Sequence, residues 1–283
     1  MNPKRKKILF LIGGVGALIT SFFLYQHFMY METDNAQIEA HVVMLAAKVP
    51  GYVTLVKVDE GQKVKKDDVL AEIDSRDYNN TLAQVKGEMA SMQARMGDAK
   101  KNFDRLQELY HKSAVSQAQY ETASSSFSEL KAKFEAVSAQ FAQAELNLEN
   151  TKIKAPSDGY IAKRGVEQGQ LAASGVPLFG FVSSEARWVV ANYKETQIED
   201  IKIGAKADIS VDAISKKNFE GHVESISSAT GAAFTLLPPD NATGNFTKVV
   251  QRIPVKIVID HLSEEDVMSL RAGLSVMVKV HKH

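Results

Sequence analysis

Two long stretches of this sequence each place an apolar residue at alternating steps of three and four. The first stretch runs from Tyr78 to Tyr110 and the second from Tyr120 to Leu148, and neither contains a proline. Steps of three and four average 3.5 residues, so the apolar side chains stay on one side of a helix. The pattern predicts two long helices within residues 75–151 that wind around each other as an antiparallel coiled coil. The first helix alone would rise about 50 Å.

The ends of these helices also carry recognisable signals. Ser116 followed by Gln119 is a capping box, which starts the second helix and leaves a short turn around residues 113–115. Asp74 or Ser75 can cap the start of the first helix. We therefore expect a long helical hairpin with a compact turn at its far end.

The beginning of the chain predicts a membrane anchor. Four cations, Lys4-Arg5-Lys6-Lys7, precede an uncharged stretch from Ile8 to Met31. About 20 apolar residues span the hydrocarbon core, and the cations hold the N-terminal tail in the cytoplasm. The alternative is a cleaved signal peptide, but no small-x-small cleavage site follows Phe23. We expect an uncleaved single-pass anchor that leaves the N-terminus in the cytoplasm and sends the bulk of the chain across the membrane.

Composition excludes several functions. The 283 residues include 34 basic and 34 acidic side chains and no cysteine. A formal charge of zero gives no reason to expect nucleic acid as a partner. Without cysteine there is no disulfide, thiol nucleophile or cysteine-ligated metal. The histidines are scattered, and we interpret His281-x-His283 as a frayed terminus rather than a metal site. The sequence predicts no catalytic residue, no cofactor and no metal.

Residues 48–74 and 152–184 form an internal repeat on either side of the helices. Three positions recur at equal spacing: Gly61, Asp67 and Leu70 in the first segment, and Gly169, Gly175 and Leu178 in the second. Both segments alternate short β-branched runs with turn residues, which predicts one small sandwich built from two halves. The pattern resembles the halves of a lipoyl or biotinyl carrier domain, with the helices inserted at their junction. Neither a Met-Lys-Met nor an Asp-Lys-Ala turn lies between the halves, so we do not expect a carrier of biotin or lipoate.

The C-terminal part reads as strands. Period-two runs such as Ala207–Val211 and Leu274–Val280 predict a small antiparallel barrel over residues 185–283, to which residues 31–47 contribute a strand. A long connection from Gly231 to Phe246 interrupts these runs. Its apolar side chains make it a candidate loop for substrate or a partner: Phe234, Leu236, Leu237 and Phe246.

The succession of anchor, half-sandwich, helices, half-sandwich and barrel resembles the periplasmic adaptors, or membrane fusion proteins, of the HlyD/EmrA class. Thr33-Asp34-Asn35-Ala36 after the anchor is part of this resemblance. The stretch from Gly231 to Pro254, which includes Val250-Gln251-Arg252-Ile253-Pro254, is similar to the EmrA branch in particular. The resemblance implies an elongated α+β fold divided into a cytoplasmic tail (1–7), an anchor (8–30), a barrel strand (31–47), a first lipoyl half (48–74), a helical hairpin (75–151), a second lipoyl half (152–184) and a barrel (185–283).

The same resemblance implies a function that is not enzymatic. Such a chain is the adaptor subunit of a tripartite multidrug efflux system, and it forms a trimer or hexamer. Its partners are an inner-membrane exporter of the major facilitator type and a TolC-like outer-membrane channel.

The end of the hairpin carries the candidate docking residues. Adaptors of this class meet the channel with an Arg, a Leu and a Ser at the spacing that Arg105, Leu109 and Ser116 have here. Arg offers a forked donor, Leu an apolar contact and Ser a hydroxyl beside the turn. The alternative interpretation is structural: a solvated cation, a neighbour of the apolar seam and a simple N-cap.

Two further functions stay open at this point. A type I protein-secretion adaptor would work with an ABC transporter, but such chains usually have a longer cytoplasmic tail than the seven residues before Ile8. A periplasmic scaffold without transport would affect the envelope and leave drug accumulation unchanged.

Overall fold

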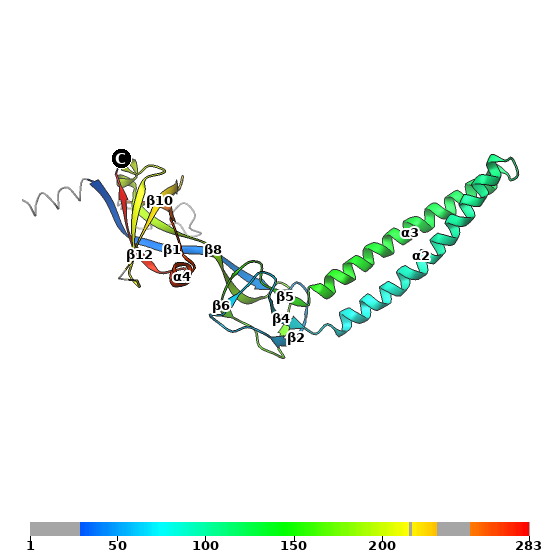
Figure 1. Ribbon diagram of the computed structural model, residues 1–283, viewed down its shortest axis with the longest axis horizontal. Helices are drawn as coiled ribbons and strands as arrows, with labels where there is room; N and C mark the ends of the chain where they lie inside the picture. The colour runs from blue at the N-terminus through cyan, green and yellow to red at the C-terminus, as the bar shows by residue number, and fades with distance from the viewer. Residues whose placement is uncertain (1–28, 215–216, 231–249, 283) are drawn as a thin grey trace, which may run out of the picture. The chain divides into compact units, whose positions relative to one another are not determined.

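A computed structural model describes residues 29–214, 217–230 and 250–282 (Figure 1). The chain forms two compact units. The sandwich unit holds residues 42–182, and the barrel unit holds the described residues up to His41 and from Ser183 onward. Residues 8–28 of the predicted anchor lie outside the described residues, and its last residue, Tyr30, begins a strand instead. The apolar residues Phe234, Leu236, Leu237 and Phe246, and His283, also lie outside the described residues.

The barrel unit is an antiparallel sheet that closes on itself. Its strands are β1 (Tyr30–Ala46), β8 (Pro177–Lys194), β9 (Lys206–Val211), β10 (Asn218–Ile226), β11 (Arg252–Ile259) and β12 (Ser275–His281). The order β1-β12-β9-β10-β11-β8 is closed by the additional pairing of β1 with β8. A 3-10 helix, η1 (Glu195–Asp200), and a short helix, α4 (Glu264–Ser269), complete the unit. The predicted barrel is confirmed, and β1 lies within one residue of the strand expected over residues 31–47.

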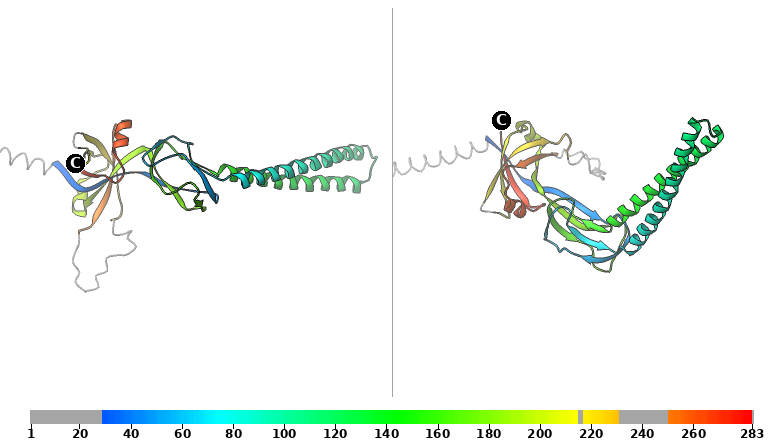
Figure 2. Two further views of the ribbon diagram at one scale, coloured as in Figure 1. Left: turned by 90° about the horizontal axis from the view of Figure 1, so that it is seen from below. Right: turned by 45° about the vertical axis from the view of Figure 1, so that its right-hand side comes forward.

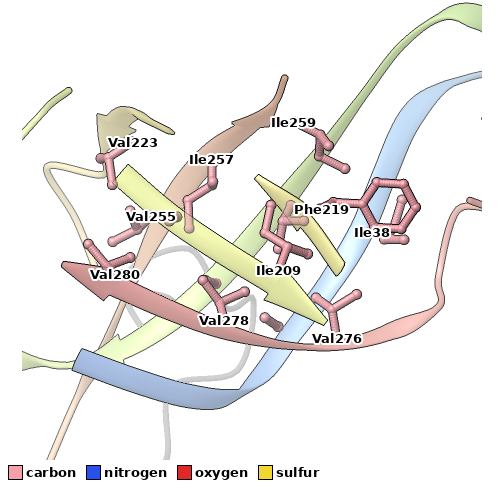
Figure 3. Close-up of a cluster of buried hydrophobic side chains, with 14 of the residues drawn as sticks. Ile38, Ile209, Phe219, Val223, Val255, Ile257, Ile259, Val276, Val278 and Val280 are labelled. Carbon is pink, nitrogen blue, oxygen red and sulfur yellow. The ribbon is translucent and has the colours of Figure 1, made fainter. Parts of the chain in front are cut away.

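Alternation along these strands produces the core of the barrel. Every second residue of β9 is buried, as are Val276, Val278 and Val280 of β12. Period two sends successive side chains to opposite faces of a strand, so one face fills the barrel (Figure 3). Tyr193 is fully buried in this cluster, and burial raises the pKa of its hydroxyl.

The sandwich unit contains the repeated segments. The first half supplies β2 (Gly51–Val56), β3 (Lys63–Val64) and β4 (Val69–Ile73), and the second supplies β5 (Lys152–Lys154), β6 (Gly159–Arg164) and β7 (Leu171–Ala172). In the strand order β5-β4-β2-β7, a strand of the second half lies at each edge and pairs with a strand of the first half. In addition, β3 of the first half pairs with β6 of the second. Each half therefore completes the sheets of the other.

Equivalent residues of the repeat make equivalent hydrogen bonds between the halves. Gly61 N–H donates to the carbonyl of Ile161, and Gly169 N–H donates to that of Val53, both at 2.7 Å. Both glycines have positive φ, 80° and 85°, which explains why glycine recurs at these turns. The repeat read from the sequence is a pseudo-twofold exchange of backbone bonds.

The second pair of repeated turn positions behaves in the same way. Asp67 N–H donates to the carbonyl of Ala155 at 2.9 Å, and Gly175 N–H donates to that of Ala47 at 3.0 Å. Asp67 has φ 67° and Gly175 has φ 81°. An aspartate thus occupies the left-handed conformation that the other half assigns to glycine, which Asp tolerates better than most residues.

Two long helices, α2 (Arg76–His111) and α3 (Gln117–Glu149), lie between the halves. They start and return at neighbouring strands, because β4 and β5 pair antiparallel with Glu72 opposite Lys152. Figures 1 and 2 show the two helices side by side, and we call them the helical pair. Seam residues on α3 such as Ala123, Val137 and Ala144 are buried, as the heptad pattern predicts.

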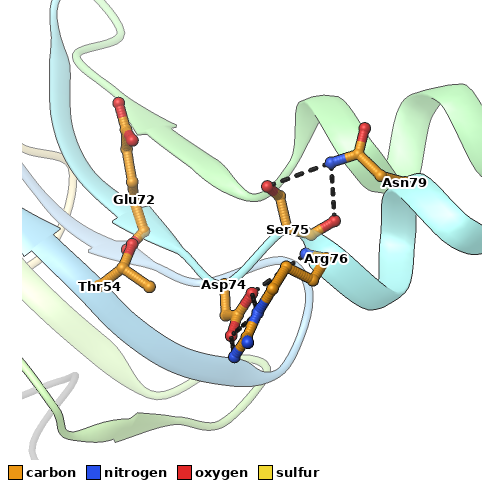
Figure 4. A network of polar contacts seen from close by, with 6 residues as sticks. All are labelled: Thr54, Glu72, Asp74, Ser75, Arg76 and Asn79. Atoms are coloured by element: carbon orange, nitrogen blue, oxygen red, sulfur yellow. Dashed lines mark hydrogen bonds and ion pairs between the residues drawn. The ribbon is translucent and has the colours of Figure 1, made fainter.

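The start of α2 is fixed differently from the expected cap. Ser75 is the N-cap residue, but its side chain makes no capping bond to the helix backbone. Instead its hydroxyl and carbonyl accept from the Asn79 amide at 3.2 and 2.9 Å, and Asp74 accepts from the backbone and guanidinium of Arg76 (Figure 4). The hydrogen bonds from the Arg76 guanidinium, and to a smaller extent the one from the Arg76 backbone N–H, lower the pKa of Asp74 to about 2. Asp74 therefore stays ionised at any physiological pH.

Two glycine substitutions test the packing of this unit. A Cβ on Gly159 would overlap the carbonyl oxygen of Val182 and the ring of Phe181, whereas a Cβ on Gly87 of α2 meets nothing within 4 Å. We expect Gly159→Ala to destabilise the sandwich by about 2 kcal/mol. Gly87→Ala should stabilise α2 by about 1 kcal/mol. Urea unfolding followed by circular dichroism measures both, and a Gly159→Ala variant as stable as the parent chain would contradict the packing.

Candidate docking site at the end of the helical pair

The far end of the helical pair is a short, backbone-bonded turn. Residues 112–116 connect the helices, and Ser113 adopts a positive φ of 56°. Ser113 N–H donates to the carbonyl of Tyr110 at 2.9 Å, and Ala114 N–H donates to that of Leu109 at 2.8 Å. The turn thus satisfies carbonyls that the end of α2 leaves free. We call residues 105–120 the tip.

Aromatic side chains fasten the two helices together behind the turn. Tyr110 stacks on Tyr120 with ring centroids 5.0 Å apart and an interplanar angle of 12°. Phe103 contacts both Tyr120 and Phe127, at 5.8 and 5.7 Å. The sequence placed all four residues in the seams but did not identify them as a stacked cluster, because stacking depends on the register between the helices. Such aromatic contacts add to area burial and stiffen the base of the tip.

Ser116 has a clear structural role. Its Oγ accepts from the backbone N–H of Gln119 at 3.3 Å, and the Gln119 side chain accepts from the backbone N–H of Ser116 at 3.0 Å. The predicted capping box is confirmed. The hydroxyl also donates to Gln119 Oε1 at 3.1 Å, so the group is already engaged within the tip.

Arg105 and Leu109 lie one turn apart on α2. Arg105 is exposed, and its guanidinium donates to the Asn102 side chain at 3.1 Å. Within the described residues its charge has no carboxylate partner. Leu109 is half-buried beside the seam. The neighbouring Glu108 is paired with Lys112 at 2.6 Å, so Arg105 carries the unpaired charge on this side of the tip.

The tip therefore presents three different chemistries. Arg105 offers a solvated forked donor, Leu109 a partly covered apolar group and Ser116 a cap at the beginning of α3. These groups suit recognition of a protein surface, because an unpaired Arg beside an apolar contact is typical of interface anchors. The structure brings the three predicted residues to the same end of the helical pair.

His281, expected in a frayed terminus, has contacts within the barrel unit. His281 Nε2 lies 3.3 Å from Asp208 Oδ2, and its ring contacts Tyr30 at 4.6 Å. No group of three or more metal-ligating side chains occurs in the part of the chain that the structure describes. Among those same residues, no helix combines the length and the apolar character that crossing a bilayer requires.

Two family models match consecutive parts of the chain. Residues 41–183 match the barrel-sandwich hybrid domain of RND membrane fusion proteins, and residues 186–281 match the AAEA-like β-barrel domain. Sandwich, inserted helices and barrel together define a periplasmic adaptor of the membrane fusion class.

Relatives narrow the class further. The chain is 32% identical to the colistin resistance protein EmrA of Acinetobacter baumannii, covering 96% of this chain and 91% of that protein. It is also 32% identical to the multidrug export protein EmrA of Haemophilus influenzae, covering 96% and 81%. A solved periplasmic adaptor EmrA has the same fold, with TM-score 0.51, 20% identity and coverage of 90% of this chain and 99% of that one. The chain belongs to the EmrA branch of the membrane fusion protein family.

Capping and docking can be separated at Ser116. We expect Ser116→Ala to lose about 1 kcal/mol at the start of α3, because the Gln119 N–H loses its acceptor. Ser116→Asp should keep the cap, since aspartate is an equally good N-cap residue. Hydrogen exchange of residues 117–123 measures the difference. Ser128→Ala, at an exposed position within α3, is the control and should leave this exchange unchanged; equal exchange in Ser116→Ala would contradict the capping role.

Proposed function

We propose that this protein is the periplasmic adaptor of a tripartite multidrug efflux system. It would join an inner-membrane exporter to an outer-membrane channel so that substrate crosses both membranes without release between them. The observation that carries the proposal is the helical pair, which is rooted at paired strands β4 and β5 and ends in a tip with an unpaired arginine. Family membership supports the same role.

The length of the helical pair suits a bridging function. The 36 residues of α2 correspond to about 54 Å of helix. We propose that the two helices supercoil as an antiparallel coiled coil and that copies of the chain, as a trimer or hexamer, place them side by side. We also propose that the domain boundaries lie near residues 48, 75, 152 and 185.

The tip would dock on a TolC-like channel through Arg105, Leu109 and Ser116. Arg105 would donate to carboxylates or carbonyls at the channel mouth, and Leu109 would fill a small apolar depression. The Ser116 hydroxyl already accepts and donates within the capping box, so its contribution would be to position the first turn of α3 beside the channel.

The exporter would be of the major facilitator type, in line with the EmrA branch. Residues 8–30 would anchor the adaptor next to the exporter in the inner membrane, with the N-terminus in the cytoplasm. The adaptor itself would perform no catalysis, and the energy for transport would come from the exporter.

Charge reversal at the tip tests the docking role. Arg105→Asp should reduce drug resistance to the level of cells without the adaptor, because a carboxylate at the channel mouth replaces a donor with a repulsive group and costs about 2 kcal/mol or more. Arg105→Lys should retain part of the resistance. The measurement is drug susceptibility of cells that contain exporter and channel, together with the amount of adaptor in the membrane.

The matched control is Arg95→Asp, an exposed arginine on the same helix further from the turn. It should leave resistance unchanged. Cross-linking from Ser116→Cys to cysteines in the channel gives a second readout that does not depend on the drug. No cross-link from Ser116→Cys to the channel, together with normal resistance in Arg105→Asp, would show that the tip is not the docking site.

A further inference from the structure

Two sequence motifs that the docking tip does not use meet in the barrel unit. Thr33-Asp34-Asn35-Ala36 lies in β1, and the stretch ending in Ile253-Pro254 begins β11. Asp34 and Arg252 line the same hollow of about 310 Å³, together with Lys194 of β8 and Gln197 of η1. We call this hollow the bulge pocket.

A β-bulge turns Asp34 toward this pocket. The β1–β12 register shifts between Thr33 and Ala36, so Asp34 and Asn35 leave the regular ladder. Thr33 Oγ1 donates to the Asn192 carbonyl at 3.0 Å and accepts from Asn35 N–H at 3.2 Å. The Asn192 amide then donates to Asn35 Oδ1 at 3.3 Å. The Thr and Asn of the motif thus hold the bulge, and Asp34 is free to face solvent.

Two cations that line the same pocket are in an unfavourable arrangement. Arg252 and Lys194 are direct partners in the antiparallel register of β11 and β8. Like charges placed opposite each other destabilise a sheet. In the described ranges neither side chain has a carboxylate partner. The arrangement is therefore suited to hold an anion between the two cations.

The same pocket also holds a carboxylate, that of Asp34, without a cationic partner among the described residues. Asp34 has no ion pair with any described residue, although Arg252 lines the same hollow. Glu32, which also lines the pocket, is paired with Lys279 at 3.5 Å and leaves Asp34 as the available carboxylate. The bulge pocket therefore offers a site for an anion and a separate site for a cation.

The sequence places the bulge pocket close to a membrane surface. Asp34 lies four residues beyond the end of the anchor proposed at residues 8–30, a reach of roughly 14 Å for extended chain. Tyr30 and the exposed Met29 end that range, and aromatic residues favour the membrane interface. A group that carries both charges at this depth is a zwitterionic lipid headgroup.

We propose that the bulge pocket binds the headgroup of an aminophospholipid such as phosphatidylethanolamine. Arg252 and Lys194 would hold the phosphate, and Asp34 would accept hydrogen bonds from the ammonium group. The binding is non-covalent and would fix the barrel unit at the membrane surface. This inference rests on the proposed anchor, but not on docking to the outer-membrane channel.

Native mass spectrometry of the full-length chain in detergent tests the site. The chain is titrated with phosphatidylethanolamine, phosphatidylcholine or phosphatidylglycerol of identical acyl chains. Phosphatidylcholine keeps the phosphate but its ammonium has no N–H donors, and phosphatidylglycerol lacks the ammonium. We expect phosphatidylethanolamine to bind most tightly.

Two variants test the carboxylate and the cations of the pocket separately. Asp34→Asn should remove the preference for phosphatidylethanolamine over phosphatidylcholine, an effect of about two- to fivefold for an exposed ion pair. Arg252→Gln should weaken binding of all three lipids by a similar factor. Asp212→Asn and Arg271→Gln, exposed residues of the same unit outside the pocket, are matched controls that should change nothing. Circular dichroism verifies that each variant is folded.

Equal binding of the three lipids, or unchanged binding in both pocket variants, would overturn the proposal. So would a result in which the variants bind lipid normally but lose cross-linking to the exporter, because the occupant would then be a protein. Extraction of membranes with alkaline carbonate reports separately on the anchor, and cross-linking at the tip reports on channel docking. Failure of the lipid site is thereby distinguished from failure of the adaptor function.

Discussion

The exchange of backbone hydrogen bonds between the two repeated segments is the constraint on which the sandwich unit depends. Each half is too small to bury a sheet face alone, and each places a glycine turn against a strand of the other. The exchange brings β4 next to β5, so the chain leaves and re-enters the sandwich at adjacent strands. Two helices that start and end there must run antiparallel, and their far ends must meet in a single turn.

The tip and the bulge pocket show how regular structure positions irregular chemistry. At the tip, the capping box and the Tyr110–Tyr120 stack fix the helix ends, which leaves Arg105 solvated and without a carboxylate partner in the described chain. In the barrel, the bulge in β1 and the register of β8 with β11 leave Asp34, Arg252 and Lys194 without ion-pair partners among the described residues. In both places regular structure holds the backbone while the charged groups are left for a ligand or partner.

Much of this fold follows from local sequence patterns. The two long helices, the Ser116–Gln119 capping box and the repeated turn glycines all depend on patterns within a few residues or one helix, and the structure confirms them. The barrel strands follow from period-two alternation. The start of β1 at Tyr30 depends on neighbours in space. The Asp74–Arg76 contact depends on a choice between competing caps, which single-residue preferences do not decide.

The candidate sites were less accessible from sequence. The spacing of Arg105, Leu109 and Ser116 is informative only when two helices meet in one turn, and the stacking of Phe103 on Phe127 requires the register between them. The convergence of Asp34 with Arg252 requires the order of the closed barrel, since the two residues are far apart in the chain. Non-local register is therefore the information that the sequence patterns lacked.

We infer that the adaptor works with its two sandwich halves paired so that β4 lies beside β5. Because the chain has no cysteine, a Glu72→Cys/Lys152→Cys pair tests this claim without interference. Directly opposed strand positions have the Cβ separation that a disulfide needs with only small adjustment. We expect a disulfide that forms spontaneously in the periplasm, detected by a mobility shift without reductant, and normal drug resistance in the oxidised protein. Absence of the disulfide, or a disulfide that abolishes resistance, would contradict it.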